Sequence, residues 1–262
     1  MKKKYIPCQL AAKNMDSAQL RESFLIDDLF ARGSIDLYYT DCDRAVVGSA
    51  CPASSPLKLE AGDELRADFF CQRRELGILN IGGTGTVGAD GMEYKLARGE
   101  SLYIGRGTKD ISFASDNSDS IAEFYLLSYP AHKQYPTLKS ALGDANMLHL
   151  GEQSQANVRT INQVICQARI QSAQLVMGYT KLEEGSVWNT MPYARAEVGN
   201  LYVFRHRTGR MRFPLYGLPA RDATYRGAQQ AGCPVAVLVD TFRMRNAQLY
   251  FLLGNGRRKP KV

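Results

Sequence analysis

The residue types that most often bind metal ions in proteins, histidine and cysteine, are few and scattered in this sequence of 262 residues. The three histidines, His132, His149 and His206, lie in three separate regions. A zinc site needs thiolates or imidazoles at short spacing, and no C-x-x-C pair is present. Spacing therefore predicts no metal site, and we expect the thiols to be reduced and inert. The six cysteines are Cys8, Cys42, Cys51, Cys71, Cys166 and Cys233.

The stretch LEEGSVWNTMPYARAEVGNLYVF, residues 182–204, nevertheless has the frame of a metal-binding loop in a β-barrel. It contains a glycine turn, an aromatic and polar run, and alternating residues that enter a strand. Ala194 and Ala196 occupy the positions where imidazoles would be expected. Glu197, inside the same loop, is a weak candidate for a catalytic base or a pocket acceptor, although an exposed loop glutamate is the more common outcome.

Arginine is concentrated after this loop, between residues 195 and 226, where only Glu197 and Asp222 are acidic. A guanidinium can bind a carboxylate or phosphate in a planar fork, which would suit an anion pocket. The alternative is a row of arginines on the solvent side of a sheet. The seven arginines are Arg195, Arg205, Arg207, Arg210, Arg212, Arg221 and Arg226.

The net charge of +7 comes from the two ends of the chain. Three basic residues lie at 2–4 and four at 257–261, and the remainder has 26 basic and 26 acidic residues. A nucleic-acid-binding protein usually carries its charge as a stripe on the folded surface, so we expect no nucleic-acid partner. No run of about 20 apolar residues could span a membrane, and no apolar segment follows the N-terminal lysines. We therefore predict a cytoplasmic protein without a membrane partner.

The patterning of the chain predicts an all-β fold with a short N-terminal helical segment. MDSAQLRESFLIDDLF has helical spacing, with Asp16 or Ser17 as N-cap. Short apolar or alternating runs separated by Gly, Asp and Asn turns then follow in two blocks, which indicates two β-barrels. The expected divisions are an N-terminal segment (1–34), a first barrel (35–134), a linker (135–157), a second barrel (158–254) and a basic tail (255–262).

Several long motifs resemble 5-keto-4-deoxyuronate isomerase, a bacterial ketol-isomerase of pectin and uronate breakdown. The resemblance is expected to run from about Leu20 to Gly254. It implies a tandem-cupin (bicupin) fold of two β-barrels, assembled as a homohexamer. The motifs are RRELGILNIGGTGTV (73–87), SLYIGRGTKDISFAS (101–115), FYLLSYPAHKQYPT (124–137), VRTIN (158–162) and WNTMP (188–192).

The family resemblance implies a zinc ion in the second barrel, bound by H-x-H-x4-E and by a histidine from a later strand. In this sequence the four positions are Ala194, Ala196, Leu201 and Thr241. Alanine and leucine have no lone pair to donate, and threonine is not a usual zinc ligand. We therefore predict that the family zinc is absent and that the chain needs no cofactor.

The remaining family motifs suggest a pocket for a small anionic sugar acid, although maintenance of the fold would explain them nearly as well. Three functions stay open. The chain is a pseudo-isomerase that binds a sugar acid or a partner, an isomerase that works without the family zinc, or a structural or regulatory subunit of an intact paralogue. The candidate pocket residues are Trp188, Asn189, Met191, Arg195, Arg73, Glu75, Arg159 and Asn162.

Overall fold

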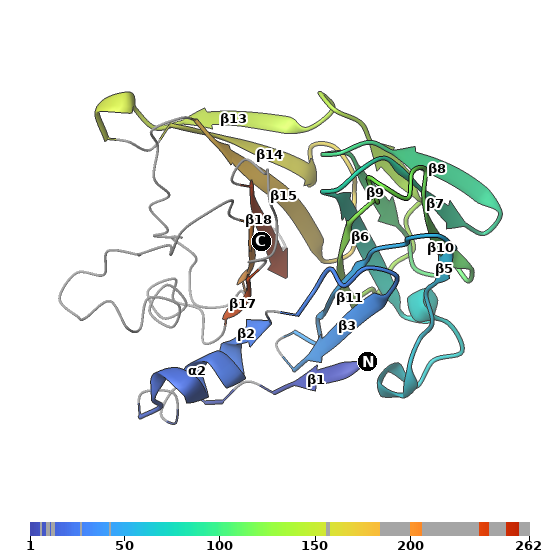
Figure 1. Ribbon diagram of the computed structural model, residues 1–262, viewed down its shortest axis with the longest axis horizontal. Coiled ribbons are helices and arrows are strands. Elements are labelled where there is room, and N and C mark those ends of the chain that lie inside the picture. The colour runs from blue at the N-terminus through green and yellow to red at the C-terminus, as the bar shows by residue number, and fades with distance from the viewer. Residues whose placement is uncertain are drawn as a thin grey trace.

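The computed structural model describes residues 1–183, apart from 6, 9–10, 12–13, 27, 42 and 156–157. It also describes the backbone of three later strands, at 200–205, 236–240 and 250–256. Strands dominate this part of the chain, as the sequence predicts (Figure 1). No helix among the described residues is long and apolar enough to cross a membrane.

The predicted N-terminal helix is present as α2 (Ser17–Phe24) and begins with a reciprocal cap. The backbone N–H of Gln19 donates to the Asp16 carboxylate at 2.8 Å, and the Asp16 N–H donates to the Gln19 side chain at 2.9 Å. Two backbone donors at the start of the helix are thereby satisfied. Asp16 is therefore the N-cap, one of the two residues expected. The short strands β1 (Lys2–Lys4) and β2 (Leu25–Ile26) lie on either side of this helix in the chain.

The first large sheet has the strand order β1-β3-β4-β11-β6-β9-β12. All its pairs are antiparallel except β1 with β3. A smaller sheet, in the order β5-β10-β7-β8, packs beside it. The additional strands of the large sheet are β3 (Ile35–Thr40), β4 (Val46–Ala50), β6 (Arg74–Asn80), β9 (Ser101–Ile104), β11 (Phe124–Pro130) and β12 (Leu138–Ser140). Those of the small sheet are β5 (Leu57–Lys58), β7 (Gly85–Ala89), β8 (Met92–Leu96) and β10 (Ile111–Ser115).

The turn between β7 and β8 follows directly from its sequence. Asp90 and Gly91 both have positive φ, at 46° and 83°. Two consecutive residues with positive φ form the type of tight turn that matches the twist of a hairpin, and Asp-Gly is a preferred pair for it. Two 3₁₀ turns, η1 (Asp63–Leu65) and η2 (Phe70–Gln72), lead from β5 to β6.

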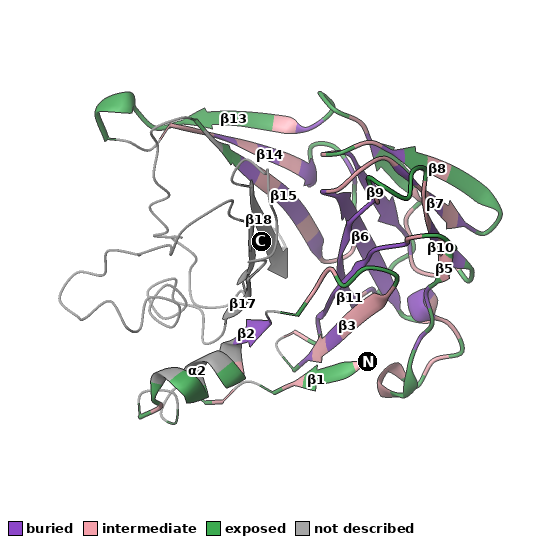
Figure 2. Ribbon diagram, viewed as in Figure 1, coloured by how far each residue is buried: buried purple, intermediate pink, exposed green. Residues whose placement is uncertain are grey.

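The large sheet is buried on both faces, so alternate residues of its central strands enter two different cores (Figure 2). On β6, Leu76 and Ile78 pack against the small sheet, whereas Leu79 faces the other way. On β11, Phe124 packs toward the small sheet and Tyr125 joins Leu79. This period of two is what a strand requires when both of its faces are covered.

The third sheet covers the second face and has the order β13-β14-β15-β18-β16-β17-β2. Its first strands pair antiparallel, but β16 pairs with β17, and β17 with β2, in parallel. The η3 turn (Gln153–Gln155) lies between its first two strands. The strands of this sheet not yet placed are β13 (Asn146–Leu150), β14 (Arg159–Ile165), β15 (Leu175–Leu182), β16 (Asn200–Arg205), β17 (Ala236–Asp240) and β18 (Tyr250–Gly256).

Two features differ from the sequence-based expectation. The described sheets have open strand orders with two edges each, and no closed barrel is seen among the described residues. The stretch 135–157, expected to be a linker, contains β12 and β13. Both strands lie at sheet edges, and most residues of β13 are exposed, so neither shows the strong apolar pattern of a buried strand.

Candidate functional site

Glu75 is the most completely bonded of the predicted site residues that the structure describes. Its side chain on β6 is fully buried. One carboxylate oxygen accepts the Tyr103 hydroxyl and the Ala173 backbone N–H, each at 2.7 Å. The other oxygen accepts the backbone N–H groups of Gln174 and Leu175, each at 2.6 Å. We call these five residues the Glu75 latch, because they join the first sheet to the start of β15.

The latch explains how a carboxylate can be buried in an apolar core. Three backbone N–H groups and one hydroxyl replace the water that an ionised carboxylate would otherwise need. Burial raises the pKa of Tyr103 well above its ordinary value, and the charge of Glu75 and the hydrogen bond to it raise it further. Tyr103 therefore stays a proton donor. The geometry gives Glu75 a structural role, and its assignment to a sugar-acid pocket stays a prediction.

Close packing at the neighbouring glycine reinforces this junction. A Cβ atom added to Gly77 would lie 2.7 Å from a Leu175 methyl carbon and 3.1 Å from the terminal carbon of Met177. Strand β6 therefore approaches β15 at a position where a side chain would collide. Side chains of β15 therefore pack directly on the backbone of β6 at Gly77, and Glu75 of the latch lies two residues before it.

Arg73 and Arg74 are adjacent but perform different tasks. Arg73 is exposed, and its guanidinium donates to the backbone carbonyls of Leu65, at 3.0 Å, and of Arg66. Arg74 is buried and donates to the Ser128 hydroxyl and carbonyl at 3.1 and 2.9 Å, and to the Arg44 carbonyl at 2.7 Å. Burial lowers the pKa of Arg74 to about 10. The sequence motif suggested Arg73 and missed Arg74, since spacing does not show which of two arginines enters the core.

Arg159 and Asn162 lie on β14 but are separated by three positions, which directs them to opposite faces of the strand. Asn162 is buried, and its side-chain amide donates to the Thr160 carbonyl at 3.4 Å. In the register of the sheet, Asn162 pairs with Tyr179 and Arg159 pairs with Leu182. These two residues do not share a face with each other.

Most of the predicted site lies outside the described residues. Leu201 is an exception, since it lies in β16, where its backbone pairs with Val237 of β17 and Gly254 of β18. The predicted site residues that lie outside the described part of the chain are Trp188, Asn189, Met191, Ala194, Arg195, Ala196, Glu197 and Thr241.

The donors available do not fit the zinc site that the family resemblance implies. The side chain of Leu201 is a hydrocarbon and has no lone pair to donate to a metal ion. His132 is exposed after β11, and His149 is exposed on β13, where its Nδ1 is 2.9 Å from the Thr160 hydroxyl. Within the described part of the chain, no three histidine, cysteine or acidic side chains gather in a way that could hold a metal ion.

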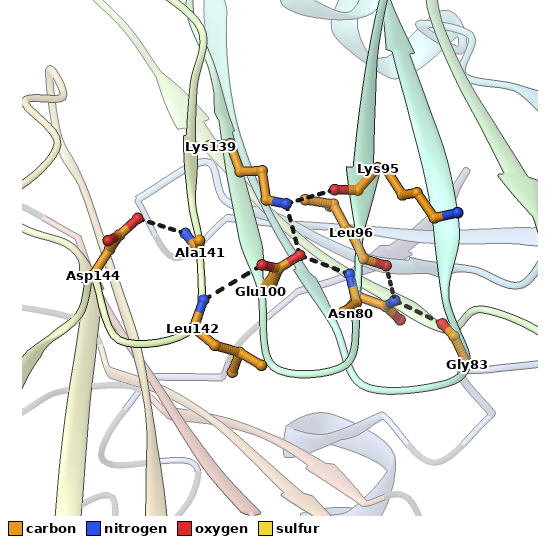
Figure 3. A network of polar contacts seen from close by, with 10 residues as sticks. Asn80, Gly83, Lys95, Leu96, Glu100, Lys139, Ala141, Leu142 and Asp144 are labelled. Atoms are coloured by element: carbon orange, nitrogen blue, oxygen red, sulfur yellow. Dashed lines mark hydrogen bonds and ion pairs between the residues drawn. The ribbon is translucent and has the colours of Figure 1, made fainter.

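A second polar network, which sequence reasoning missed, anchors the connection between the sheets (Figure 3). The Glu100 carboxylate accepts the Ala97 N–H and the Lys139 ammonium, each at 2.8 Å, and the Leu142 N–H at 3.4 Å. Partial burial raises the pKa of Glu100, but the bonds from Lys139 and Ala97 outweigh it and hold the pKa below its ordinary value. Beside it, buried Asn80 donates to the Gly83 and Leu96 carbonyls at 2.7 and 2.8 Å.

A hollow of about 680 Å³ lies on the far side of the first sheet from the third. Residues of both charges line it, including Lys58, Asp63, Arg66 and Asp110. Lys58 and Asp110 form an exposed ion pair at 3.0 Å. None of the predicted site residues that the structure describes lines this hollow.

Comparison with known proteins places the chain beside sugar-acid isomerases. A sequence model of the KduI/IolB family matches residues 27–194. The 4-deoxy-L-threo-5-hexosulose-uronate ketol-isomerase of Formosa agariphila is 49% identical over 189 residues, covering 72% of this chain and 68% of that protein. The enzymes of the same name from Lachnoclostridium phytofermentans and Bacillus pumilus are 50% and 46% identical, over 69% and 73% of this chain and 65% and 70% of theirs. The family match ends well before Gly254, to which we expected the resemblance to extend.

Proposed function

The chain belongs to the KduI/IolB family, and from this membership we propose that it derives from a uronate ketol-isomerase whose metal-dependent step it has lost. The identity of 49% over 189 residues to an enzyme of that name is the observation that carries the first half of the proposal. The second half rests on the donors at the four ligand positions. Turnover of 4-deoxy-L-threo-5-hexosulose uronate, measured beside an intact relative, tests the whole.

The reaction explains why the missing donors matter. A ketol-isomerase moves a proton between neighbouring carbons through an enediolate. A bound metal would act as a Lewis acid and stabilise the oxyanion that develops. Of this chain's residues, Ala194, Ala196 and Leu201 have no lone pair for that metal. The proposal therefore makes the chain a pseudo-isomerase with the family scaffold in its first two-thirds.

The proposed architecture and surroundings follow the family resemblance. We place two cupin barrels in tandem, with the first large sheet and the small sheet forming the first of them. A cytoplasmic homohexamer is the proposed assembly. Gel filtration with light scattering distinguishes a hexamer from a monomer, and co-purification with an intact paralogue would favour a structural or regulatory subunit instead.

A second candidate function, binding of a sugar acid, is favoured by the arginine excess between residues 195 and 226. Arg195 is its candidate anchor, although regular strand alternation would direct it away from residues 194 and 196. This function predicts that uronates or citrate raise the melting temperature, because a ligand selective for the folded state stabilises it. Arg195→Ala should abolish the shift and leave the unliganded melting temperature unchanged. An equal shift in the variant, or none in the parent, would eliminate this candidate.

A further inference from the structure

The sequence similarity of this chain to its family ends abruptly and does not decline gradually along the sequence. The family match covers residues 27–194 and then stops. Within the aligned region about half of the residues are identical to those of the Formosa agariphila enzyme, and nearly a third of that enzyme remains unmatched. A sequence that specifies a fold is consistent across its whole length, so gradual substitution would leave the core pattern of the second half recognisable.

The composition changes at the same place. Residues 193–262 contain eleven arginines, two lysines and only three acidic residues. Residues 1–192 contain twenty basic and twenty-three acidic residues. The strands change too, since β16 pairs in parallel with β17, whereas the neighbouring strands β3 to β12 of the first large sheet pair antiparallel throughout. A cupin or jelly-roll barrel is an antiparallel architecture, so the parallel pairs of β16 with β17 and of β17 with β2 depart from the regular form of the second barrel proposed above.

We propose that from Pro192 onward this chain is translated in a reading frame displaced by one nucleotide from the frame that its relatives use. This inference rests on the proposed function and supplies a cause for the lost metal step. A displaced frame replaces every residue after the junction at once. It therefore accounts together for the abrupt end of the likeness, the change in charge and the simultaneous loss of four ligands.

The genetic code permits the family spacing of ligands one to two residues before Ala194, Ala196 and Leu201, the positions assigned by direct counting. Codons CCA for Pro192 and TAC or TAT for Tyr193 contain the histidine codon CAT, one base further on. Codons GCA for Ala194 and CGN for Arg195 contain CAC in the same way. Codons GGA for Gly199 and AAC or AAT for Asn200 contain the glutamate codon GAA. The displaced frame thus reads His-x-His-x4-Glu, the spacing that the family resemblance implies.

The same displacement recovers the distant ligand. Thr241 followed by Phe242, read as ACA and TTC or TTT, contains the histidine codon CAT. Thr241 is also the position that the family resemblance implies for the third histidine. One set of permitted codons lets the displaced frame of residues 192–205 encode HTHERKWEIYMYF. Its second half is rich in the aromatic and branched residues that strands favour, and it contains two glutamates where the present segment has only Glu197.

The test is the nucleotide sequence of the gene, because the protein sequence does not determine the third base of these codons. Proline, alanine, glycine and threonine codons each have four synonymous third bases. We expect adenine as the third base for Pro192, Ala194, Gly199 and Thr241, and a displaced frame without a stop codon from residue 192 to residue 256. Another third base at Ala194 or Thr241, or a stop codon in that range, would overturn the displaced frame.

A second arm uses the protein. Two nucleotides inserted between the codons of Met191 and Pro192 restore the family frame, and the restored protein is purified beside the present full-length chain. We expect about one zinc per restored chain by elemental analysis and a chelator-sensitive melting temperature, with neither in the present chain. A restored protein that folds but binds no zinc would contradict the proposal. If the gene has other third bases and the present chain is still inactive, the proposed function stands, and ordinary amino-acid substitution explains the loss of the metal ligands. If the gene has the expected third bases but the restored protein does not isomerise uronate, the proposed function is wrong.

Discussion

Turnover of 4-deoxy-L-threo-5-hexosulose uronate by the present chain is expected to be several orders of magnitude below that of the Formosa agariphila enzyme. Metal stabilisation of a developing oxyanion is worth several kcal/mol, and each 1.4 kcal/mol corresponds to about tenfold in rate. Alanine and leucine at the ligand positions cannot supply that stabilisation. The measurement is a direct assay of both purified proteins at equal concentration, with and without added zinc.

The folded state of the present chain must be checked in the same experiment. A cooperative melting transition and the circular dichroism of a β-protein serve as controls, so that low activity is not mistaken for unfolding. Activity within about tenfold of the relative would mean that the catalytic residues lie elsewhere in the chain. In that case the zinc-independent isomerase would become the leading function.

Replacement of Glu75 by alanine is expected to destabilise the protein by about 3–5 kcal/mol, because the buried donors of the latch lose their acceptor. The backbone N–H groups of Ala173, Gln174 and Leu175 and the Tyr103 hydroxyl would all be affected. Urea unfolding, followed by fluorescence or circular dichroism, measures the change in free energy of unfolding.

Matched variants separate this effect from a simple loss of charge. Tyr103→Phe removes a single donor and should cost about 1 kcal/mol. Glu93→Ala, on the exposed face of β8, should change stability by less than about 0.5 kcal/mol. If Glu75→Ala were no more destabilising than Tyr103→Phe, the latch would not be the main link between β6 and β15.

The parts of the fold that could be predicted are those with local causes. The cap at Asp16 depends on a residue three positions away, and the turn at Asp90 depends on the glycine that follows it. The alternation along β11 reflects a strand covered on both faces. Such signals lie within a few residues of one another, so a single sequence reveals them.

The latch could not be predicted, because its partners are far apart in the chain. Glu75 meets backbone groups about one hundred residues later, with separations of 98, 99 and 100 positions. Backbone N–H groups carry no side-chain identity, so no motif marks them. The family motif suggests a pocket role for Glu75, which stays a prediction, and the hydrogen bonds of its carboxylate show in addition that it joins two sheets.

The edge strands were missed for a different reason. In β13, Met147, Leu148 and Leu150 are exposed hydrophobic residues, so the strand lacks the alternation that a half-buried sheet requires. The ligand positions are a different case, because the sequence names them directly and the structure describes only one of them. A count along the sequence named Leu201, but the structure describes only its backbone within β16.

Elemental analysis of the present chain, purified without added metal and then dialysed, is the most direct test of the lost zinc site. We predict far less than one zinc per chain, both as purified and after incubation with excess zinc. About one zinc per chain that withstands dialysis would contradict the loss of the site. If that zinc also disappeared in a variant of His132, His149 or His206, a metal site built from residues outside the family motif would replace it.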